Sequence, residues 1–267
     1  FTVASYDIDY AMIGVSVMDK KVTTAELGEE HMRTLKRMAQ EEGIITPFYT
    51  ATGWGNAAVI DNEAIPVTSA YTYPFWEEPR MSPFCMFKDI HCVPDYAPVR
   101  YDAERFPSFC AEMGAGIQMI YRRRPIVTAR AAQALMIRTL GSGSNGIGYY
   151  MYPGGSTPLR QDNIGSYQDE PMGIPKISYD FQAPLGEFGL EHPSYRYLRT
   201  IHSFLADFGS NLAPMETVLP EGWEKMTPEN RDDLRYAARM KDDSGFIFMI
   251  NFQDHDTLRH DMDGLQL

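Results

Sequence analysis

Hydrophobic residues along most of the chain follow two alternating patterns. Apolar positions at helical spacing predict three helices, at 23–43, 126–140 and 194–208. The first opens with a capping box formed by Thr23 and Glu26. Short apolar or alternating runs predict strands at 11–17, 44–51, 65–73, 107–111 and 146–152. Strands that alternate with helices predict βαβ units and a parallel sheet, in either a barrel or an open sheet.

The pattern changes towards the end of the chain. Residues 158–189 are polar and rich in turn-forming residues, and the apolar run GFIFMINF predicts a strand at 245–252. We therefore predict an α/β domain over 1–211, followed by the incomplete beginning of a β-rich accessory domain over 212–267. The segment 76–105 is rich in Pro and aromatic residues without a clear period, so we expect a long loop over a binding face.

The charge of the chain disfavours one class of partner. The formal net charge is -12, whereas proteins that bind nucleic acid hold the phosphate backbone with clustered Lys and Arg. The only basic run, YRRRP at 121–125, is interpreted as the solvated start of a helix. The longest apolar runs are far shorter than the roughly 20 residues needed to cross a bilayer, so no membrane span is predicted.

The segment GSGSNG at 141–146 matches the dinucleotide-binding pattern G-x-G-x-x-G. In a dinucleotide site the pattern follows a strand and opens a helix, because the pyrophosphate rests on that helix N-terminus. Here the order is reversed, so we interpret the glycines as a flexible helix-to-strand turn and disfavour a dinucleotide-dependent oxidoreductase. The sequence also lacks G-x-S-x-G and H-E-x-x-H motifs, which disfavours serine and zinc hydrolases.

The candidate chemistry centres on one carboxylate. In the stretch FPSFCAEMGAGIQ, Glu112 stands at the end of a predicted strand and before a glycine-rich turn. Reactive groups of parallel α/β folds gather at this end of the strands, where the aromatic-rich turns at Trp54, Tyr73 and 150–152 are also expected. Aromatic side chains combined with carboxylates are typical of carbohydrate sites. In the alternative interpretation, Glu112 caps the Gly114 turn or pairs with the arginines at 122–124.

Five segments carry a more specific signal. They are GEEHMRTLKRMAQEEGI (28–44), PFYTATGWGNAAV (47–59), FCAEMGAGIQMIYRRRP (109–125), GYYMYPGGSTP (148–158) and SYDFQAPLGEFG (178–189). Together and in this order, they resemble glycoside hydrolase family 35, the β-galactosidase family. The third segment is similar to the nucleophile strand of bacterial members. The resemblance covers roughly residues 28–214.

The resemblance implies the C-terminal part of a (β/α)8 TIM barrel, about strands four to eight. It also implies hydrolysis of terminal β-D-galactosides with retention of configuration, through a covalent glycosyl-enzyme. Glu112 matches the nucleophile of the family. The positions that match the substrate site are Asp19, Trp54, Tyr150, Tyr179 and Phe181. Phe181 replaces a second tyrosine that relatives often carry, so one hydroxyl contact is expected to be missing; Glu187 also matches a motif position.

The acid/base residue departs from the family pattern. The register of the GEEH segment places Asp19 at the family's asparagine and Lys20 at its catalytic glutamate. The retaining mechanism needs a second carboxyl group about 5 Å from the nucleophile. An ammonium group with an ordinary pKa near 10.4 is a poor proton donor at neutral pH. Two hypotheses follow: a retaining exo-glycosidase, or a galactoside-binding pseudoenzyme in which Lys20 has replaced the acid/base.

The resemblance also sets expectations for partners. Because it begins at the fourth barrel strand, we expect the chain to be part of a larger enzyme, and the isolated chain to be unstable and inactive. The expected partner is a β-galactoside or a related oligosaccharide. No metal or organic cofactor is expected, because the two-carboxylate mechanism needs none. The compartment is not defined by the sequence, which shows no signal peptide and leaves export of the parent enzyme open.

Overall fold

The computed structural model describes residues 24–51, 65–72, 80–93, 95, 101–162, 166 and 174–256. Contacts divide the chain into two units. The described part of the first unit comprises residues up to Ser69, 89–111 and 144–148. The second unit comprises 70–88, 112–143 and the residues from Tyr149 onward.

The first described element of the first unit is an amphipathic helix. Helix α2 spans Thr24–Glu41, and the chain leaves it through Gly43, which has a φ of +83°. The predicted helix is thus confirmed, with a glycine in the left-handed conformation at its end. The predicted strand 44–51 is wrong in its first half, because strand β1 spans only Tyr49–Ala51. Ile45 is 90% exposed, and Pro47 has no backbone N–H to donate to a strand ladder.

A four-stranded sheet follows the order of the chain, β1-β2-β3-β4. Strand β2 spans Ile65–Tyr71, β3 spans Phe109–Gly114 and β4 spans Gly146–Tyr149. Strands β1 and β2 pair in parallel, with Tyr49 opposite Ile65. Sequential order with a helix between β3 and β4 is typical of successive βαβ units. The closed barrel stays a prediction.

Helix α3 spans Ala129–Gly141 in the second unit. The side-chain oxygen of Thr128 accepts a hydrogen bond from the backbone N–H of Ala131 and caps this helix. The interpretation of 121–125 as the start of the helix is therefore wrong: the basic run lies in the irregular segment before the cap. The helix ends where the 141–146 segment begins and β4 follows, so the helix-to-strand turn is confirmed.

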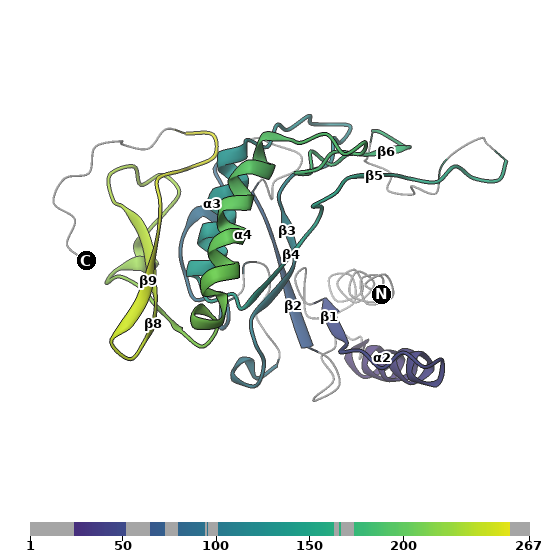
Figure 1. The fold of residues 1–267 in the computed structure, drawn as a ribbon, viewed down its shortest axis with the longest axis horizontal. Helices are drawn as coiled ribbons and strands as arrows, with labels where there is room; N and C mark the ends of the chain where they lie inside the picture. The colour runs from purple at the N-terminus through teal and green to yellow at the C-terminus, as the bar shows by residue number, and fades with distance from the viewer. Residues whose placement is uncertain are drawn as a thin grey trace. The chain divides into compact units, whose positions relative to one another are not determined.

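Helix α4 spans Pro193–Leu212 and packs alongside α3 (Figure 1). An antiparallel sheet follows, with β7 at Glu216–Val218, β8 at Arg235–Lys241 and β9 at Ser244–Ile250. The predicted helix at 194–208 and the predicted strand at 245–252 are confirmed within a few residues at each end. The accessory-domain boundary at residue 212 stays a prediction.

The β7–β9 sheet is fixed to the two helices by a buried arginine. Arg239, which is 1% exposed, donates hydrogen bonds to the carbonyl oxygens of Leu140, Leu212 and Met215. Two of these carbonyls belong to the last turns of α3 and α4, where helix carbonyls lack partners within the helix. The guanidinium group therefore satisfies the helix ends and attaches the sheet to them.

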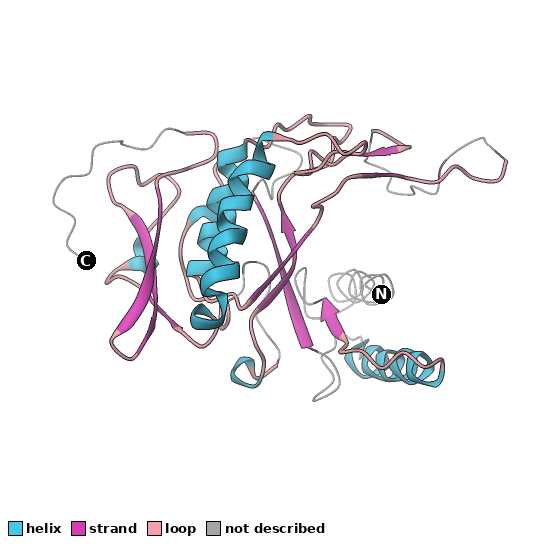
Figure 2. Ribbon diagram, in the orientation of Figure 1, coloured by secondary structure: helices cyan, strands magenta, loops and turns pink. Residues whose placement is uncertain are grey.

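The remaining regular structure consists of short pieces (Figure 2). Strands β5, Gly155–Ser156, and β6, Ser178–Tyr179, form an antiparallel pair. Single 3-10 turns lie at Pro83–Cys85 (η1), Ala103–Arg105 (η2) and Trp223–Lys225 (η3). In the described parts of 76–105, η1 and η2 are the only regular elements, as expected for a loop. Among the helices that the structure describes, none is long and apolar enough to cross a membrane.

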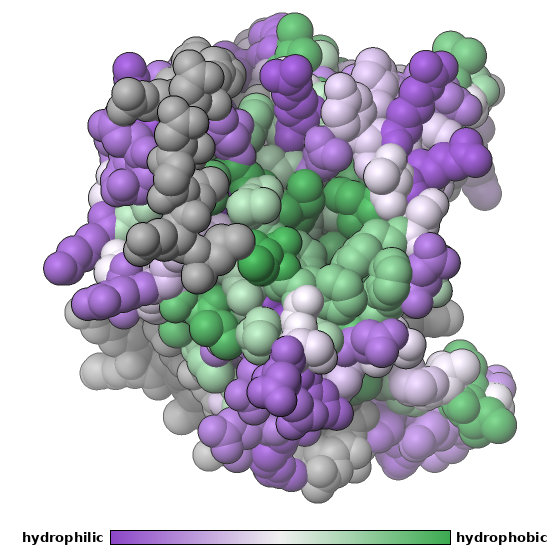
Figure 3. All heavy atoms as spheres, turned by 60° about the vertical axis from the view of Figure 1, so that its left-hand side comes forward, coloured by the Kyte–Doolittle hydropathy of each residue, from purple (hydrophilic) through white to green (hydrophobic). Residues whose placement is uncertain are grey.

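The outer face of the β7–β9 sheet is apolar. Phe248 is buried on the face towards α3, where a side chain at Gly141 would collide with it. Alternate residues of a strand lie on opposite faces, so Ile247 and Met249 lie on the other face, and they are 46% and 47% exposed. Figure 3 turns the side of β8 and β9 forward and shows apolar side chains gathered in a hollow bordered by polar ones.

Candidate functional site

Glu112 lies inside strand β3, not at its end. The strand continues for two residues beyond it to Gly114, so the sequence-based strand end was placed too early. The carboxylate is half-buried, and its Oε2 atom accepts a hydrogen bond from the phenol of Tyr71 at 3.1 Å. Tyr71 is the last residue of the neighbouring strand β2 and is 2% exposed. Two adjacent strands thus position the carboxylate and the hydroxyl group that orients it.

Two glycines after Glu112 are required by close contacts. A Cβ atom on Gly114 would lie 2.1 Å from the ring carbon Cδ1 of Tyr71. A Cβ atom on Gly116 would lie 2.1 Å from the carbonyl oxygen of Phe181. Neither position has room for a side chain, because heavy atoms at that distance overlap. The glycine-rich turn therefore lets both the Tyr71 ring and the 178–189 loop approach the end of β3.

Three of the predicted substrate residues form one aromatic cluster. The hydroxyl oxygens of Tyr150 and Tyr179 are 2.6 Å apart. The ring of Phe181 lies with its centroid 5.3 Å from that of Tyr150 and 5.4 Å from that of Tyr179, so it contacts both tyrosines. The backbone N–H of Tyr150 donates to the carbonyl of Met113, the residue after Glu112. The structure therefore brings these three residues together and connects them to β3.

The loop that carries Tyr179 packs on the Pro153-Gly154-Gly155 segment. Asp180 accepts hydrogen bonds from the backbone N–H groups of Gln182 and Glu187, at 3.2 and 2.8 Å. A Cβ atom on Gly154 would lie 2.7 Å from the Asp180 carbonyl oxygen, and one on Gly186 would lie 2.7 Å from its Oδ1 atom. Asp180 thus organises the loop, a role that the sequence motif does not reveal by itself.

Glu187, the other carboxylate at a motif position, is held in its ionised form. Hydrogen bonds from the hydroxyl groups of Ser156 and Ser178 lower the pKa of Glu187 below its ordinary value. A carboxyl group with a lowered pKa is ionised at neutral pH and has no proton to give to a leaving group. Glu187 is therefore poorly suited to act as a general acid.

The neighbours of Tyr150 in sequence face helix α4. The hydroxyl oxygen of Tyr149 lies 2.6 Å from the Nε2 atom of His202, and burial lowers the pKa of this histidine. The ring centroid of Tyr152 lies 5.6 Å from that of His202 and 6.2 Å from that of Tyr195. Tyr149 and Tyr152 therefore fix the 149–152 segment to α4.

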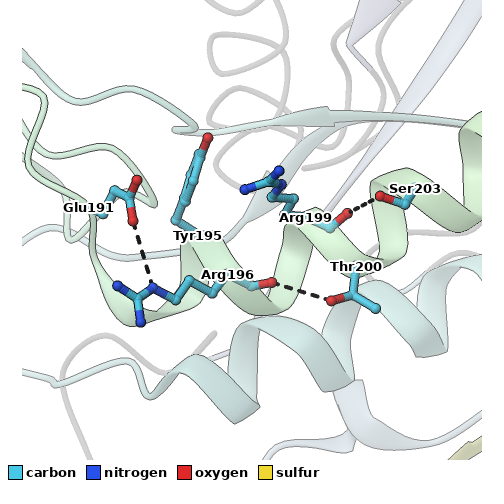
Figure 4. Close-up of a pocket in the computed structure, with 6 residues that line it drawn as sticks. All are labelled: Glu191, Tyr195, Arg196, Arg199, Thr200 and Ser203. Carbon is cyan, nitrogen blue, oxygen red and sulfur yellow. Dashed lines mark hydrogen bonds and ion pairs between the residues drawn. The ribbon is translucent and has the colours of Figure 1, made fainter.

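A hollow lies along the polar face of α4 (Figure 4). It is lined by Glu191, Tyr195, Arg196, Arg199, Thr200 and Ser203. Arg196 forms an exposed ion pair with Glu191 at 3.7 Å, and the hydroxyl groups of Thr200 and Ser203 donate to carbonyls one helical turn earlier. The hollow contains none of the predicted site residues, and we assign it no part in the chemistry of Glu112.

Some predicted site residues are not part of this geometry. Asp19, Lys20 and Trp54 lie outside the described residues, so the identity of the acid/base stays a prediction. Sequence reasoning missed Tyr71; the signal for it was an aromatic residue at the end of the strand before the one that carries Glu112. It also missed Gln182, for which the sequence gives no signal beyond its place in a motif.

Within the described ranges, no group of three or more His, Cys, Asp and Glu side chains is arranged to hold a metal ion. Comparison with known proteins gives no assignment: no family model matches the chain, and no curated protein matches it.

Proposed function

We propose that the chain contributes to a retaining exo-glycosidase that hydrolyses terminal β-D-galactosides, with Glu112 as the nucleophile. The observation that carries this proposal is the packing around Glu112. Three of the five segments that resemble glycoside hydrolase family 35, namely 109–125, 148–158 and 178–189, meet beside it. In the first of these segments, Gly114 leaves space for the Tyr71 ring and Gly116 leaves space for the carbonyl oxygen of Phe181.

In this mechanism, a carboxylate oxygen of Glu112 attacks the anomeric carbon as the bond to the leaving oxygen breaks. The leaving oxygen takes up a proton, and a water molecule later cleaves the glycosyl ester and restores the carboxylate. The hydrogen bond from Tyr71 fixes the rotation of the carboxylate before attack. A fixed orientation lowers the barrier because the reacting atoms are already aligned.

The aromatic cluster supports a sugar as the substrate. The hydroxyl groups of Tyr150 and Tyr179 form a directional pair suited to exchange hydrogen bonds with sugar hydroxyls. Phe181 contributes its ring but no hydroxyl group. We therefore propose that the site makes one hydrogen bond fewer to the sugar than relatives with a second tyrosine.

The second candidate function is a galactoside-binding pseudoenzyme, in which Lys20 occupies the acid/base position. The feature that favours it is the residue at position 20, where the register of the GEEH segment places Lys rather than a carboxylic acid. A protein of this kind keeps the aromatic cluster and binds the sugar, but does not protonate the leaving oxygen.

Covalent labelling distinguishes the two candidates. The full-length protein is incubated with a 2-fluoro-galactosyl inactivator that carries a good leaving group, and the labelled peptide is identified by mass spectrometry. We expect the label on Glu112, because a good leaving group departs without acid assistance. The variant Glu112→Gln serves as the control and is expected to bind galactose without being labelled. A folded protein that binds galactose but acquires no label would overturn the enzyme proposal and leave the binding function.

A further inference from the structure

The loop that carries the aromatic cluster contains two strained residues. Phe181 and Gln182 have φ values of +56° and +52°. This left-handed conformation is unfavourable for residues with a Cβ atom, and two in succession persist only when other contacts hold them. Phe181 is 5% exposed, so its ring is held by packing. The contacts of Gln182 are polar.

The carboxamide of Gln182 bonds to three backbone groups. Its Oε1 atom accepts a hydrogen bond from the N–H of Val127 at 3.1 Å. Its Nε2 atom donates to the carbonyl oxygens of Pro125 and Ile117, at 2.8 and 3.1 Å. Ile117 follows the glycine turn of β3, and the other two residues precede α3. The side chain thus connects the strained loop to the segment that leaves the nucleophile strand.

The position of this connection matters for the sugar site. Next to Gln182, the Phe181 carbonyl oxygen occupies the space that a side chain at Gly116 would need. The Phe181 ring contacts Tyr150 and Tyr179, whose hydroxyl groups face each other. A shift of the 181–182 backbone away from β3 would therefore move the aromatic cluster relative to Glu112.

We propose that Gln182 is a positioning residue of the sugar site, which sets the distance between the aromatic cluster and Glu112. This inference rests on the proposed function and adds to it a residue that touches neither the sugar nor the nucleophile. The carboxamide of Gln182 supplies the acceptor that the N–H of Val127 requires and the donor that the carbonyl oxygens of Pro125 and Ile117 require. A side chain with only one of these groups leaves buried backbone groups unpaired.

The test compares the variants Gln182→Met and Gln182→Glu with the wild type in the full-length protein. The readouts are the concentration dependence (KI) and the maximal rate (kinact) of Glu112 labelling by the 2-fluoro-galactosyl inactivator. We expect KI to rise about tenfold in both variants, because the aromatic cluster is displaced, while kinact changes less. Gln161→Met makes the same chemical change at an exposed turn and is expected to match the wild type. Thermal unfolding and circular dichroism report whether each variant is folded.

Gln182→Glu supplies a readout that a purely structural residue would not affect. Its carboxylate repels the carbonyls of Pro125 and Ile117, whereas its protonated form donates one hydrogen bond. Its kinact/KI relative to wild type is therefore expected to increase as the pH falls from about 7 to about 5. Glu112 and Asp180 are present in both proteins, and each variant is compared with wild type at the same pH.

The outcomes separate this proposal from the proposed function. Wild-type KI and kinact in folded Gln182→Met, with normal labelling of Glu112, would overturn the positioning role and leave the proposed function intact. A Gln182→Glu variant with raised KI but no pH dependence would also count against it. Absence of labelling in the wild type would overturn the proposed function itself, and the positioning role with it.

Discussion

Tyr71 acts on Glu112 through a single hydroxyl group. Replacement by Phe removes the hydrogen bond to Oε2 but keeps the ring that packs against Gly114. A hydrogen bond to a charged group contributes about 1.5–3 kcal/mol, which corresponds to about 10- to 150-fold in rate when the bond aligns the reacting group. We expect Tyr71→Phe to lower the maximal rate of Glu112 labelling by this factor, as measured with the 2-fluoro-galactosyl inactivator.

The control is Tyr121→Phe, which removes a hydroxyl group from a side chain that is 80% exposed. It is expected to be labelled at the wild-type rate. If Tyr71→Phe is labelled as fast as this control, the hydrogen bond seen in the structure does not assist Glu112.

Gly114 gives a second prediction for a single residue. In Gly114→Ala, the new methyl group would lie 2.1 Å from the Tyr71 ring, so the ring or the strand must move. Overpacking of this kind typically costs about 1–3 kcal/mol, and we expect the free energy of unfolding in urea to fall by that amount. Gly155→Ala is the matched control, because no atom lies within 4 Å of its Cβ position. Equal stabilities of the two variants would contradict the close approach of Tyr71 to β3.

At the scale of elements, the sequence predicted those whose pattern is contained within a short stretch of the chain. The helices α2, α3 and α4 were found because their apolar positions repeat within a few turns. The predicted strand ends were less accurate. Strand β3 extends to Gly114 within a sheet whose neighbouring strands, β2 and β4, are distant in the sequence, so a short stretch of sequence does not reveal where β3 ends. The same reason explains the missed site residues: Tyr71 bonds to a residue 41 positions away, and Gln182 to residues 55 to 65 positions away.

A buried carboxylate after β9 makes the attachment of this strand sensitive to pH. The Oδ1 atom of Asp254 accepts a hydrogen bond from the N–H of Ser82, before η1, at 2.8 Å. Burial raises the pKa of Asp254 above its ordinary value of 3.8. The folded state therefore holds this proton more tightly than the unfolded chain. The protonated Asp254 therefore contributes to the free energy of unfolding. This contribution is fully present below the pKa of Asp254 in the unfolded chain, and it is lost as the pH rises through its raised pKa in the folded state.

The variant Asp254→Asn keeps an acceptor for Ser82 but does not titrate. We expect its free energy of unfolding, relative to wild type, to increase as the pH rises through this window, as measured by urea unfolding at a series of pH values. Arg235 and His255, which lie near Asp254, are unchanged in the variant. Asp243→Asn changes an exposed carboxylate in the same way and serves as the control. A difference between Asp254→Asn and wild type that is constant with pH would contradict this account.

At the scale of the whole molecule, the proposed reaction needs a nucleophile and an acid/base. The structure describes Glu112, the proposed nucleophile, but not position 20, the proposed place of the acid/base. The second unit contains Glu112, the proposed nucleophile, its hydrogen-bond donor Tyr71 and the aromatic cluster. In the proposed reaction, the proton for the leaving oxygen would come from position 20, where the sequence has Lys. These two halves of the mechanism can be separated, because formation of the glycosyl-enzyme from a substrate with a good leaving group needs little acid assistance.

Substrate choice therefore tests the assignment of Lys20. We expect aryl galactosides with good leaving groups to form the glycosyl-enzyme, whereas disaccharides react more slowly by about 100-fold or more, the contribution typical of a general acid. Lys20→Glu is expected to increase disaccharide hydrolysis, since it restores a carboxyl group at the acid/base position, and Lys225→Glu, an equal change of charge at an exposed site, is not. Equal rates on both substrate classes in the wild type would show that another group donates the proton. No gain from Lys20→Glu in a folded protein would remove position 20 from the mechanism.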